Sequence, residues 1–163
     1  MHTILPAVIN AIDNQDLPLL DKIFSLLSMA FKFLLKQIKE DINNVYIVLF
    51  ELIRHQNKFV RKFASQSLSY VIRKLPIDQA LIKIILDPLI EENEDKAEVR
   101  NAILGTADLF HEVIRGQGDD LHSKARPVLA ELLASPLVLT SAITRQMIRT
   151  LCLKLVNSID TSK

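Results

Sequence analysis

The alternation of apolar and polar side chains between residues 57 and 75 predicts a single amphipathic helix. Apolar residues recur there every three to four positions, the spacing that places them on one helix face; they are Val60, Ala64, Leu68, Val71 and Leu75, flanked by Phe59 and Phe63. Polar residues that water can solvate fall on the opposite face; they are Lys58, Lys62, Ser65, Ser69 and Arg73. We therefore expect a buried apolar stripe and an exposed polar face.

The same pattern along the chain predicts about eight helices separated by short polar breaks. They span residues 2–13, 17–39, 45–56, 57–75, 77–92, 97–115, 119–135 and 139–159. The second is apolar on more than one face, so we expect it to be sandwiched between neighbours. We expect a kink at Pro88 and a kink or restart at Pro127. With only three glycines and six prolines in 163 residues, an all-α fold is favoured over a sheet.

Three of these helices share a pattern that repeats along the chain. They open with Val60-Arg61, Val99-Arg100 and Thr144-Arg145, and the three arginines are 39 and 45 residues apart. The apolar positions that follow also correspond, in the sets Ala64/Ile103/Ile148, Leu68/Ala107/Cys152, Val71/Phe110/Leu155 and Leu75/Ile114/Ile159. Helix pairs of the HEAT and armadillo type repeat every 40 to 47 residues or so. The expected fold is therefore an α-solenoid of stacked antiparallel helix pairs.

We expect residues 1–163 to form a single HEAT-like segment of a longer solenoid. Neither terminal helix carries the polar outer face that a capping repeat needs, so both ends resemble cuts through a stack. No apolar run reaches the length that spans a bilayer, and no signal peptide is expected. The lone cysteine, Cys152, excludes an internal disulfide and fits a reducing intracellular compartment. In the repeat it corresponds to Leu68 and Ala107, so we expect a small buried side chain.

The sequence offers no constellation for catalysis, and we expect a protein that is not an enzyme. The four histidines show no metal-ligand spacing; they are His2, His55, His111 and His122. An acidic stretch lacks the ligand spacing and central glycine of a calcium loop, so a solvated turn is expected at Glu91, Glu92, Glu94 and Asp95. We expect no catalytic, cofactor-binding or metal-binding residue and no small-molecule substrate.

Basic residues are concentrated in the first half, although the net charge is only +1. Residues 22–74 carry ten basic against three acidic residues, and residues 75–122 carry four against eleven. Basic side chains on stacked helices suit contacts with RNA phosphates or a partner; the candidates are Lys32, Lys36, Lys39, Lys58, Arg61, Lys62, Arg73 and Lys74. The alternative is that they only solvate the helix backs, because no exposed aromatic residues are interleaved with them.

Three consecutive stretches resemble the central region of the small-subunit processome component 20 family, also called down-regulated in metastasis. They are Phe24–Ile42, Val45–Asn57 and Lys58–Leu75. The motifs that match are Phe31-Lys32-Phe33-Leu34, Val60-Arg61-Lys62-Phe63-Ala64-Ser65 and the residues from Tyr70 to Lys74. Gln66 departs from the pattern, because the family usually has Glu there. The resemblance covers about a third of the chain, and the remainder is only generically HEAT-like.

The resemblance implies a non-enzymatic scaffold of the pre-ribosomal particle that matures small-subunit ribosomal RNA. It implies a location in the nucleus, in the nucleolus. The implied partners are other pre-ribosome assembly proteins, with pre-ribosomal RNA as a candidate contact and no membrane. The alternative is a HEAT-repeat scaffold of another large assembly, such as a transport receptor or a kinase-associated solenoid.

Overall fold

The computed structural model describes residues 17–34, 42–90, 96–116 and 120–160, which form eight α-helices and one short 3-10 helix. The helices are α2 (Leu17–Leu34), α3 (Ile42–Leu52), α4 (Lys58–Ile72), α5 (Gln79–Leu86), η1 (Asp87–Leu89), α6 (Lys96–Ile114), α7 (Ala125–Ala134), α8 (Leu137–Thr140) and α9 (Ala142–Asp160). The predicted all-α class is confirmed for these residues, and the helix expected over 2–13 lies outside them. None of the helices described is long and apolar enough to cross a membrane.

The prolines and one serine shape the helix boundaries. The expected kink at Pro88 is a change of helix type, because α5 ends at Leu86 and the chain continues as the 3-10 turn η1. The helix expected over 119–135 is shorter: residues 120–124 are not helical, and α7 begins at Ala125 with Pro127 in its first turn, where its missing N–H is tolerated. The single helix expected over 139–159 is instead two helices, α8 and α9. Ser141 separates them in an extended conformation, and its Oγ accepts a hydrogen bond from the N–H of Thr144.

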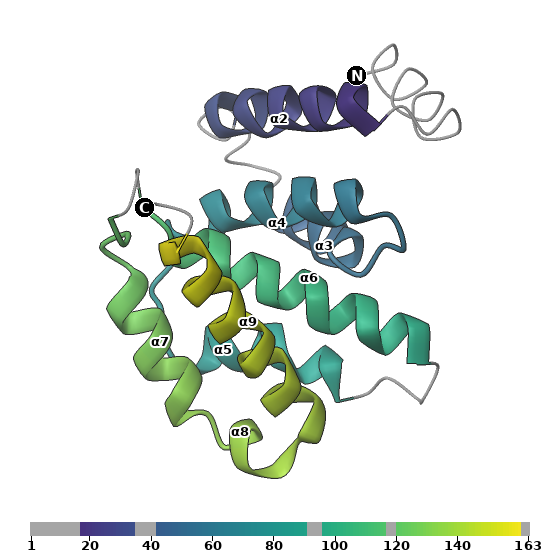
Figure 1. The fold of residues 1–163 in the computed structure, drawn as a ribbon. Coiled ribbons are helices and arrows are strands. Elements are labelled where there is room, and N and C mark those ends of the chain that lie inside the picture. Colours follow the sequence, from purple (N-terminus) through teal and green to yellow (C-terminus); the bar gives the residue numbers. More distant parts are fainter. Residues whose placement is uncertain (1–16, 35–41, 91–95, 117–119, 161–163) are drawn as a thin grey trace.

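Helices α2, α4, α6 and α9 form a row in which each contacts the next, as Figure 1 shows. Of the other helices, α3 contacts α4, α7 and η1 contact α6, α8 contacts α9 and α7, and α5 contacts α7 and η1. The helices of the row are therefore covered in part by these shorter helices, and the core forms between them.

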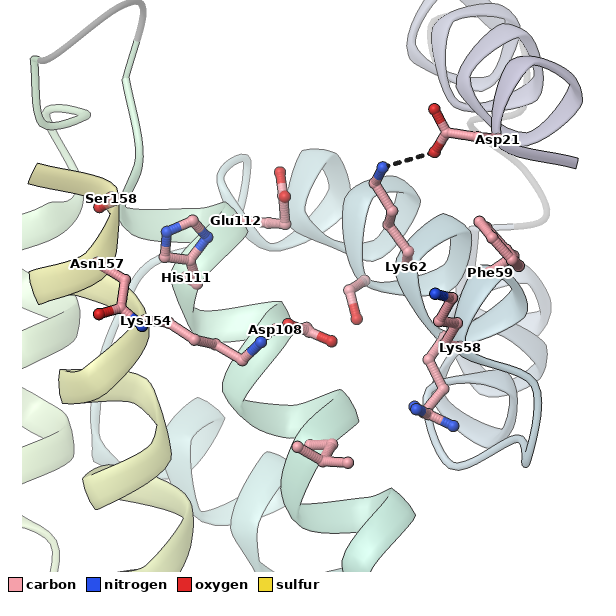
Figure 2. Close-up of a pocket in the computed structure, with 13 residues that line it drawn as sticks. Asp21, Lys58, Phe59, Lys62, Asp108, His111, Glu112, Lys154, Asn157 and Ser158 are labelled. Carbon is pink, nitrogen blue, oxygen red and sulfur yellow. Dashed lines mark hydrogen bonds and ion pairs between the residues drawn. The ribbon is translucent and has the colours of Figure 1, made fainter. Parts of the chain in front are cut away.

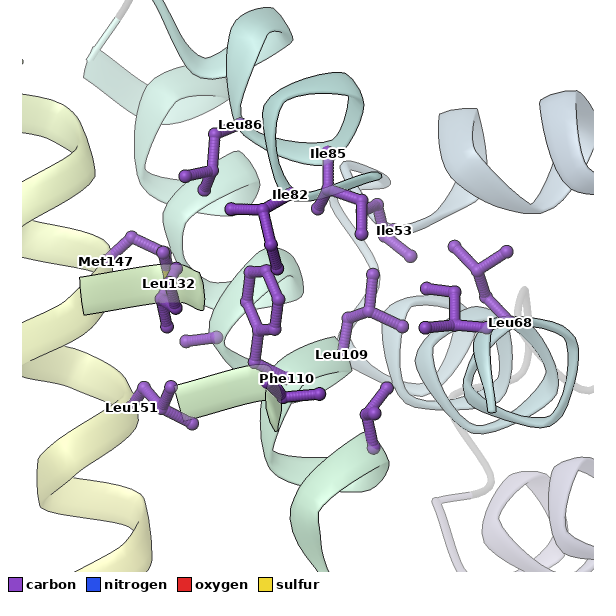
Figure 3. Packing of buried hydrophobic residues seen from close by; sticks show 14 of the residues in the cluster. Ile53, Leu68, Ile82, Ile85, Leu86, Leu109, Phe110, Leu132, Met147 and Leu151 are labelled. Atoms are coloured by element: carbon purple, nitrogen blue, oxygen red, sulfur yellow. The ribbon is translucent and has the colours of Figure 1, made fainter. Parts of the chain in front are cut away.

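The core is centred on α6. Phe110 is 2% exposed and lies among apolar side chains of α5, α7 and α9, as Figure 3 shows. Other fully buried members of the same cluster are Ile53, Leu68, Ile82, Ile85, Leu86, Leu109, Leu132, Met147 and Leu151. Burial of such a side chain stabilises the fold by roughly 1.5–3 kcal/mol. One continuous core thus joins α4 to α7 and α9.

The apolar stripe of α4 is buried as predicted at Val60, Ala64, Leu68 and Val71, whereas Leu75, beyond the end of the helix, is exposed. The prediction that Ser65 and Ser69 face solvent is wrong, because both are buried. The reason is that α4 contacts α2, α3 and α6, so three sides of it are covered. The two hydroxyls are satisfied internally by the carbonyl oxygens of Gly105 and Gln66.

Helices α4 and α6 lie side by side and run in the same direction. The hydrogen bonds between them include those from Arg61 to Asn101, from Ser65 to Gly105 and, from the residue that follows α4, from Arg73 to Val113; each of these spans 40 residues of sequence. The difference in residue number between bonded partners stays the same along both helices, which requires them to be parallel. In antiparallel neighbours, a later residue of one helix would pair with an earlier residue of the other. The lateral spacing therefore agrees with the repeat length of about 40 residues in the sequence.

The burial expected for Cys152 is wrong, because its side chain is exposed. Helix α9 buries Met147 and Leu151 instead. Each of these residues precedes by one position the residue expected to be buried, Ile148 or Cys152. Among the described helices, α9 has row contact only with α6, so its far side faces solvent. The alignment of the three helices that share the repeated pattern assumed that each of them has neighbours on both sides.

Candidate functional site

A groove of about 730 Å³ crosses the exposed side of the helix row, over α4, α6 and α9 with α2 at its rim (Figure 2). This volume lies within the range of ligand-binding clefts. Its lining residues are mostly polar or charged; they are Asp21, Lys58, Phe59, Arg61, Lys62, Ser65, Leu104, Asp108, His111, Glu112, Lys154, Asn157 and Ser158. The groove is our candidate functional site, because most of these side chains come from helices far apart in sequence.

Two ion pairs hold neighbouring helices together along the groove. Lys62 Nζ on α4 lies 2.8 Å from Asp21 Oδ1 on α2, and Lys154 Nζ on α9 lies 2.6 Å from Asp108 Oδ1 on α6. The hydrogen bond and positive charge of Lys62 lower the pKa of the Asp21 carboxyl below its ordinary value. Pairs this exposed contribute little to stability, so they orient the helices without fixing the groove rigidly.

Arg61 lines the groove but is only 8% exposed. Its Nη1 donates hydrogen bonds to the carbonyl oxygens of His55 and Gln56, at 2.8 and 2.7 Å, and to Asn101 Oδ1 at 3.3 Å. Burial lowers the pKa of Arg61, and the nearby charge of Asp108 opposes this shift. Because its guanidinium is engaged inside the chain, we remove Arg61 from the candidate contact surface; it joins the turn after α3 to α6.

Arg73 also has an internal role. Its Nε donates to the carbonyl oxygen of Val113, and its Nη2 donates to those of Glu112 and Arg115. These are carbonyls at the C-terminal end of α6, where a cation is favoured by the helix dipole. Burial lowers the pKa of Arg73. Arg73 therefore caps α6, and it too leaves the candidate contact surface.

The other members of the candidate set do not form one surface. Lys58 and Lys62 are exposed in the groove. Lys32 is exposed on α2, with its Nζ 5.8 Å from the centre of the Tyr70 ring, and Lys74 is exposed beyond the end of α4. Lys36 and Lys39 lie outside the described residues.

The repeated arginines have partly equivalent positions. Arg61 binds the carbonyls five and six residues before it, and Arg145 binds those of Val138 and Leu139, seven and six residues before it, at 3.3 and 2.8 Å. Arg100 is exposed, and the carbonyls at the equivalent distance fall in residues outside the described ranges. Two of the three arginines therefore clamp the turn that enters their own helix, which the sequence alignment alone did not reveal.

The chemistry available in the groove is that of binding. His111 is half-buried, and burial is the main cause that lowers its pKa below the ordinary value. Within the described parts of the chain, no group of three or more His, Cys, Asp and Glu side chains could hold a metal ion. The acidic residues 91–95 are outside those parts. The groove can exchange hydrogen bonds and ion pairs with a partner through Lys58, Asp108 and their neighbours.

A second exposed feature is an apolar stripe on α2. Leu19, Leu26, Met29 and Phe33 are between 44% and 66% exposed and follow a helical spacing that places them on one face. The sequence predicted a helix sandwiched between neighbours. Helix α2 contacts α4 on one side, and no described helix covers the stripe. Solvated large apolar stripes of this kind mark contact surfaces.

Comparison with known proteins finds a distant, partial similarity to U3 small nucleolar RNA-associated protein 20 of Saccharomyces cerevisiae. The two sequences are 27% identical over 118 residues, which is 72% of this chain. The same stretch is only 5% of the yeast protein. No family model matches the chain, and no solved structure matches it.

Proposed function

We propose that this chain is a helical-repeat scaffold of the small-subunit processome that supports ribosome biogenesis through protein contacts. Two observations support the family assignment. One is the ordered series of motifs between Phe24 and Leu75, and the other is the distant similarity to the yeast protein, whose name associates it with U3 small nucleolar RNA. On this proposal the chain acts in the nucleolus, has no catalytic activity of its own and presents surfaces to other assembly proteins.

The observation that carries the scaffold proposal is the parallel pairing of α4 and α6 at a constant separation of 40 residues. In an up-and-down bundle consecutive helices are antiparallel, so alternate helices such as α4 and α6 would be parallel there too. What favours a repeat is that the separation of 40 residues along the α4–α6 contact is close to the spacing of Arg61 and Arg100 in the sequence. In a HEAT-type solenoid, the equivalent helices of successive repeats are parallel neighbours. The row α2–α4–α6–α9, with α3, η1 and α7 packed on it, supports the same architecture.

The exposed stripe on α2 supports a stack that continues beyond this helix. Its four large apolar side chains lie on the face of α2 that no described helix covers. In a solenoid the equivalent face of each helix packs on the helix of the preceding repeat. We therefore propose that the stripe packs against another repeat of a longer protein. The yeast relative is such a long protein, since the aligned stretch is only 5% of its length.

Direct contact with pre-ribosomal RNA is the weaker part of the proposal. Of the candidate cations, Arg61 and Arg73 bind carbonyl groups inside the chain. Lys32, Lys58, Lys62 and Lys74 are the exposed members that the structure describes. If they contact RNA, binding weakens steeply with salt, because each neutralised phosphate releases counterions.

The alternative function is a HEAT-repeat interaction scaffold of another large assembly, such as a transport receptor or a kinase-associated solenoid. Both functions need the same architecture, so they differ only in the particle to which the chain belongs. The discriminating experiment is sedimentation of the tagged chain from its own cells on a gradient, with sequencing of co-purified RNA. Co-migration with particles that contain U3 small nucleolar RNA supports the processome; migration with an assembly that lacks ribosomal precursors supports the alternative.

A matched pair of variants makes this experiment specific. Phe33→Glu places a charge in the exposed stripe of α2, and Ile84→Glu places one at an exposed apolar position of α5. If the stripe is a stacking surface in a longer protein, the first variant made in that protein should reduce recovery of the particle and the second should not. Equal recovery with both variants would contradict a role for the stripe.

A further inference from the structure

The charges in the groove alternate from one helix to the next. Helix α4 contributes Lys58 and Lys62, α6 contributes Asp108 and Glu112, and α9 contributes Lys154, as Figure 2 shows. Because α4 contacts α6 and α6 contacts α9, the order across the groove is basic, acidic, basic. Packed helices lie about 8–10 Å apart, so a segment crossing the row meets a change of sign at each helix.

This pattern is poorly suited to a nucleic-acid strand. A strand carries a negative charge at every phosphate, and in the middle of the groove it would lie over Asp108 and Glu112. Like charges brought together at an interface disfavour the complex. Asp21 adds a third carboxylate at the rim. The groove therefore selects against a regular polyanion, although two lysines on α4 belong to the candidate RNA-contact set.

Most charged groups of the groove are available to a partner; the exception is Glu112, which is only 15% exposed and is paired with Arg115. The pair Lys62–Asp21 is half exposed at both side chains, and Lys154–Asp108 is about a third exposed. Exposed pairs are worth little, so an incoming side chain can replace either member. Behind the basic side lies Arg61, a buried cation whose Nε has no hydrogen-bond partner. An acidic group arriving over α4 would gain from this additional positive charge.

We propose that the groove binds an extended segment of a protein partner whose charged side chains follow the order acidic, basic, acidic. The outer acidic side chains pair with Lys58 or Lys62 on α4 and with Lys154 on α9, and the central basic side chain pairs with Asp108 on α6. An extended chain advances about 3.3 Å per residue, so successive charges are about three residues apart. This inference rests on the proposed scaffold function and names the chemistry of its partner.

The test uses a photo-cross-linking amino acid in the full chain, expressed in its own cells. One version carries it at Ser158, which lines the groove, and the control carries it at Ile84 on α5, which is exposed outside the groove. Adducts are digested with nuclease or with protease and identified by mass spectrometry. We expect a protein adduct at Ser158, absent at Ile84, that contains the acidic–basic–acidic order. Nucleotide adducts at Ser158, no adduct, or a peptide without this order would overturn the inference.

A charge swap with the captured peptide completes the test. Lys58→Glu changes an exposed side chain, and it should weaken binding of the synthetic peptide by about tenfold, as loss of a charge pair at an interface does. Reversal of the matching acidic residue of the peptide to lysine should restore binding to the variant. Unchanged affinity for Lys58→Glu would contradict the proposed pairing. If the groove tests fail while the chain still co-migrates with U3-containing particles, the scaffold function stands and the groove inference does not.

Discussion

Ser65 and Gly105 are joined by a buried hydrogen bond that links two helices 40 residues apart in the sequence. Ser65 Oγ on α4 donates to the carbonyl oxygen of Gly105 on α6, at 3.1 Å. Gly105 also lies against the turn after α3, where an added Cβ would be 1.6 Å from the carbonyl oxygen of Ile53. Three segments of the chain therefore meet at Gly105, and the close approach depends on its missing side chain.

We expect Gly105→Ala to destabilise the fold by roughly 3 kcal/mol or more, because overpacking against main-chain atoms cannot be relieved by a rotamer change. Alanine in a helix is otherwise favoured over glycine by about 1 kcal/mol, so the loss would run against intrinsic helix propensity. Urea unfolding followed by circular dichroism measures the change. Ala130→Gly, at an exposed position of α7, is the control and should cost only about 1 kcal/mol. An unchanged or increased stability of Gly105→Ala would contradict the close approach.

Arg61 and Arg145 offer a matched comparison of the arginine clamp. Both bind main-chain carbonyls of the preceding turn, but Arg61 is buried and Arg145 is exposed. We expect Arg61→Ala to cost roughly 1–3 kcal/mol, since it leaves part-buried carbonyls without donors, and Arg145→Ala to cost less than about 1 kcal/mol. Thermal unfolding of the two variants is the measurement. Similar losses would show that burial does not decide the strength of the clamp.

Phe110 and Phe63 differ in burial, and truncation should reflect this difference. Phe110 is 2% exposed in the centre of the core, whereas Phe63 is only partly buried at its edge. We expect Phe110→Ala to cost about 3–5 kcal/mol, the usual range for a buried phenylalanine. Phe63→Ala should cost less, roughly 1–3 kcal/mol, because less surface returns to water. A larger loss for Phe63→Ala in a urea melt would contradict the position of the core.

Acidification should destabilise the fold through His111. Its pKa in the folded chain lies below the ordinary value of 6.5, chiefly because of burial; the charges of Arg115 and Lys154 lower it further, while Glu112 and Asp108 raise it. The unfolded chain therefore binds the proton first, and stability falls as the pH falls below about 6.5.

Urea melts between pH 7.5 and the carboxylate range near pH 4 would measure this dependence. The pKa of His122 is also lowered by burial, so His111→Gln should reduce the slope of stability against pH without abolishing it. A slope unchanged by His111→Gln would show that its proton is not linked to folding.

The sequence predicted the helices better than the surface. Apolar spacing located most helices, and the alignment of Arg61 with Arg100 anticipated the 40-residue separation of α4 and α6 contacts. Periodicity reports which residues are apolar, and it says nothing of how many neighbours a helix has. Ser65 and Ser69 were therefore expected to be solvated, although a third neighbour covers them. Cys152 was expected to be buried, although α9 lacks a second row neighbour among the described helices.

The candidate contact residues were predicted from charge alone, which does not distinguish a free cation from one that binds main-chain carbonyls. Arg61 and Arg73 belong to the second kind. The groove joins Lys58, Asp108 and Lys154 from three helices. Its alternating charge depends on which helices are neighbours, so it emerges only from the fold.

The direction of α6 relative to α4 is the most direct test of the stacked-repeat account. Spin labels are placed in a Cys152→Ser background at Lys58 with Glu98, and at Lys58 with Arg115, all of them exposed positions. With 1.5 Å of rise per residue, the two α6 positions are about 25 Å apart. The account predicts a short distance for the pair 58/98, below about 20 Å, because packed parallel helices lie about 8–10 Å apart, and a clearly longer one for 58/115. The reverse order would mean antiparallel helices and would contradict the repeat stack.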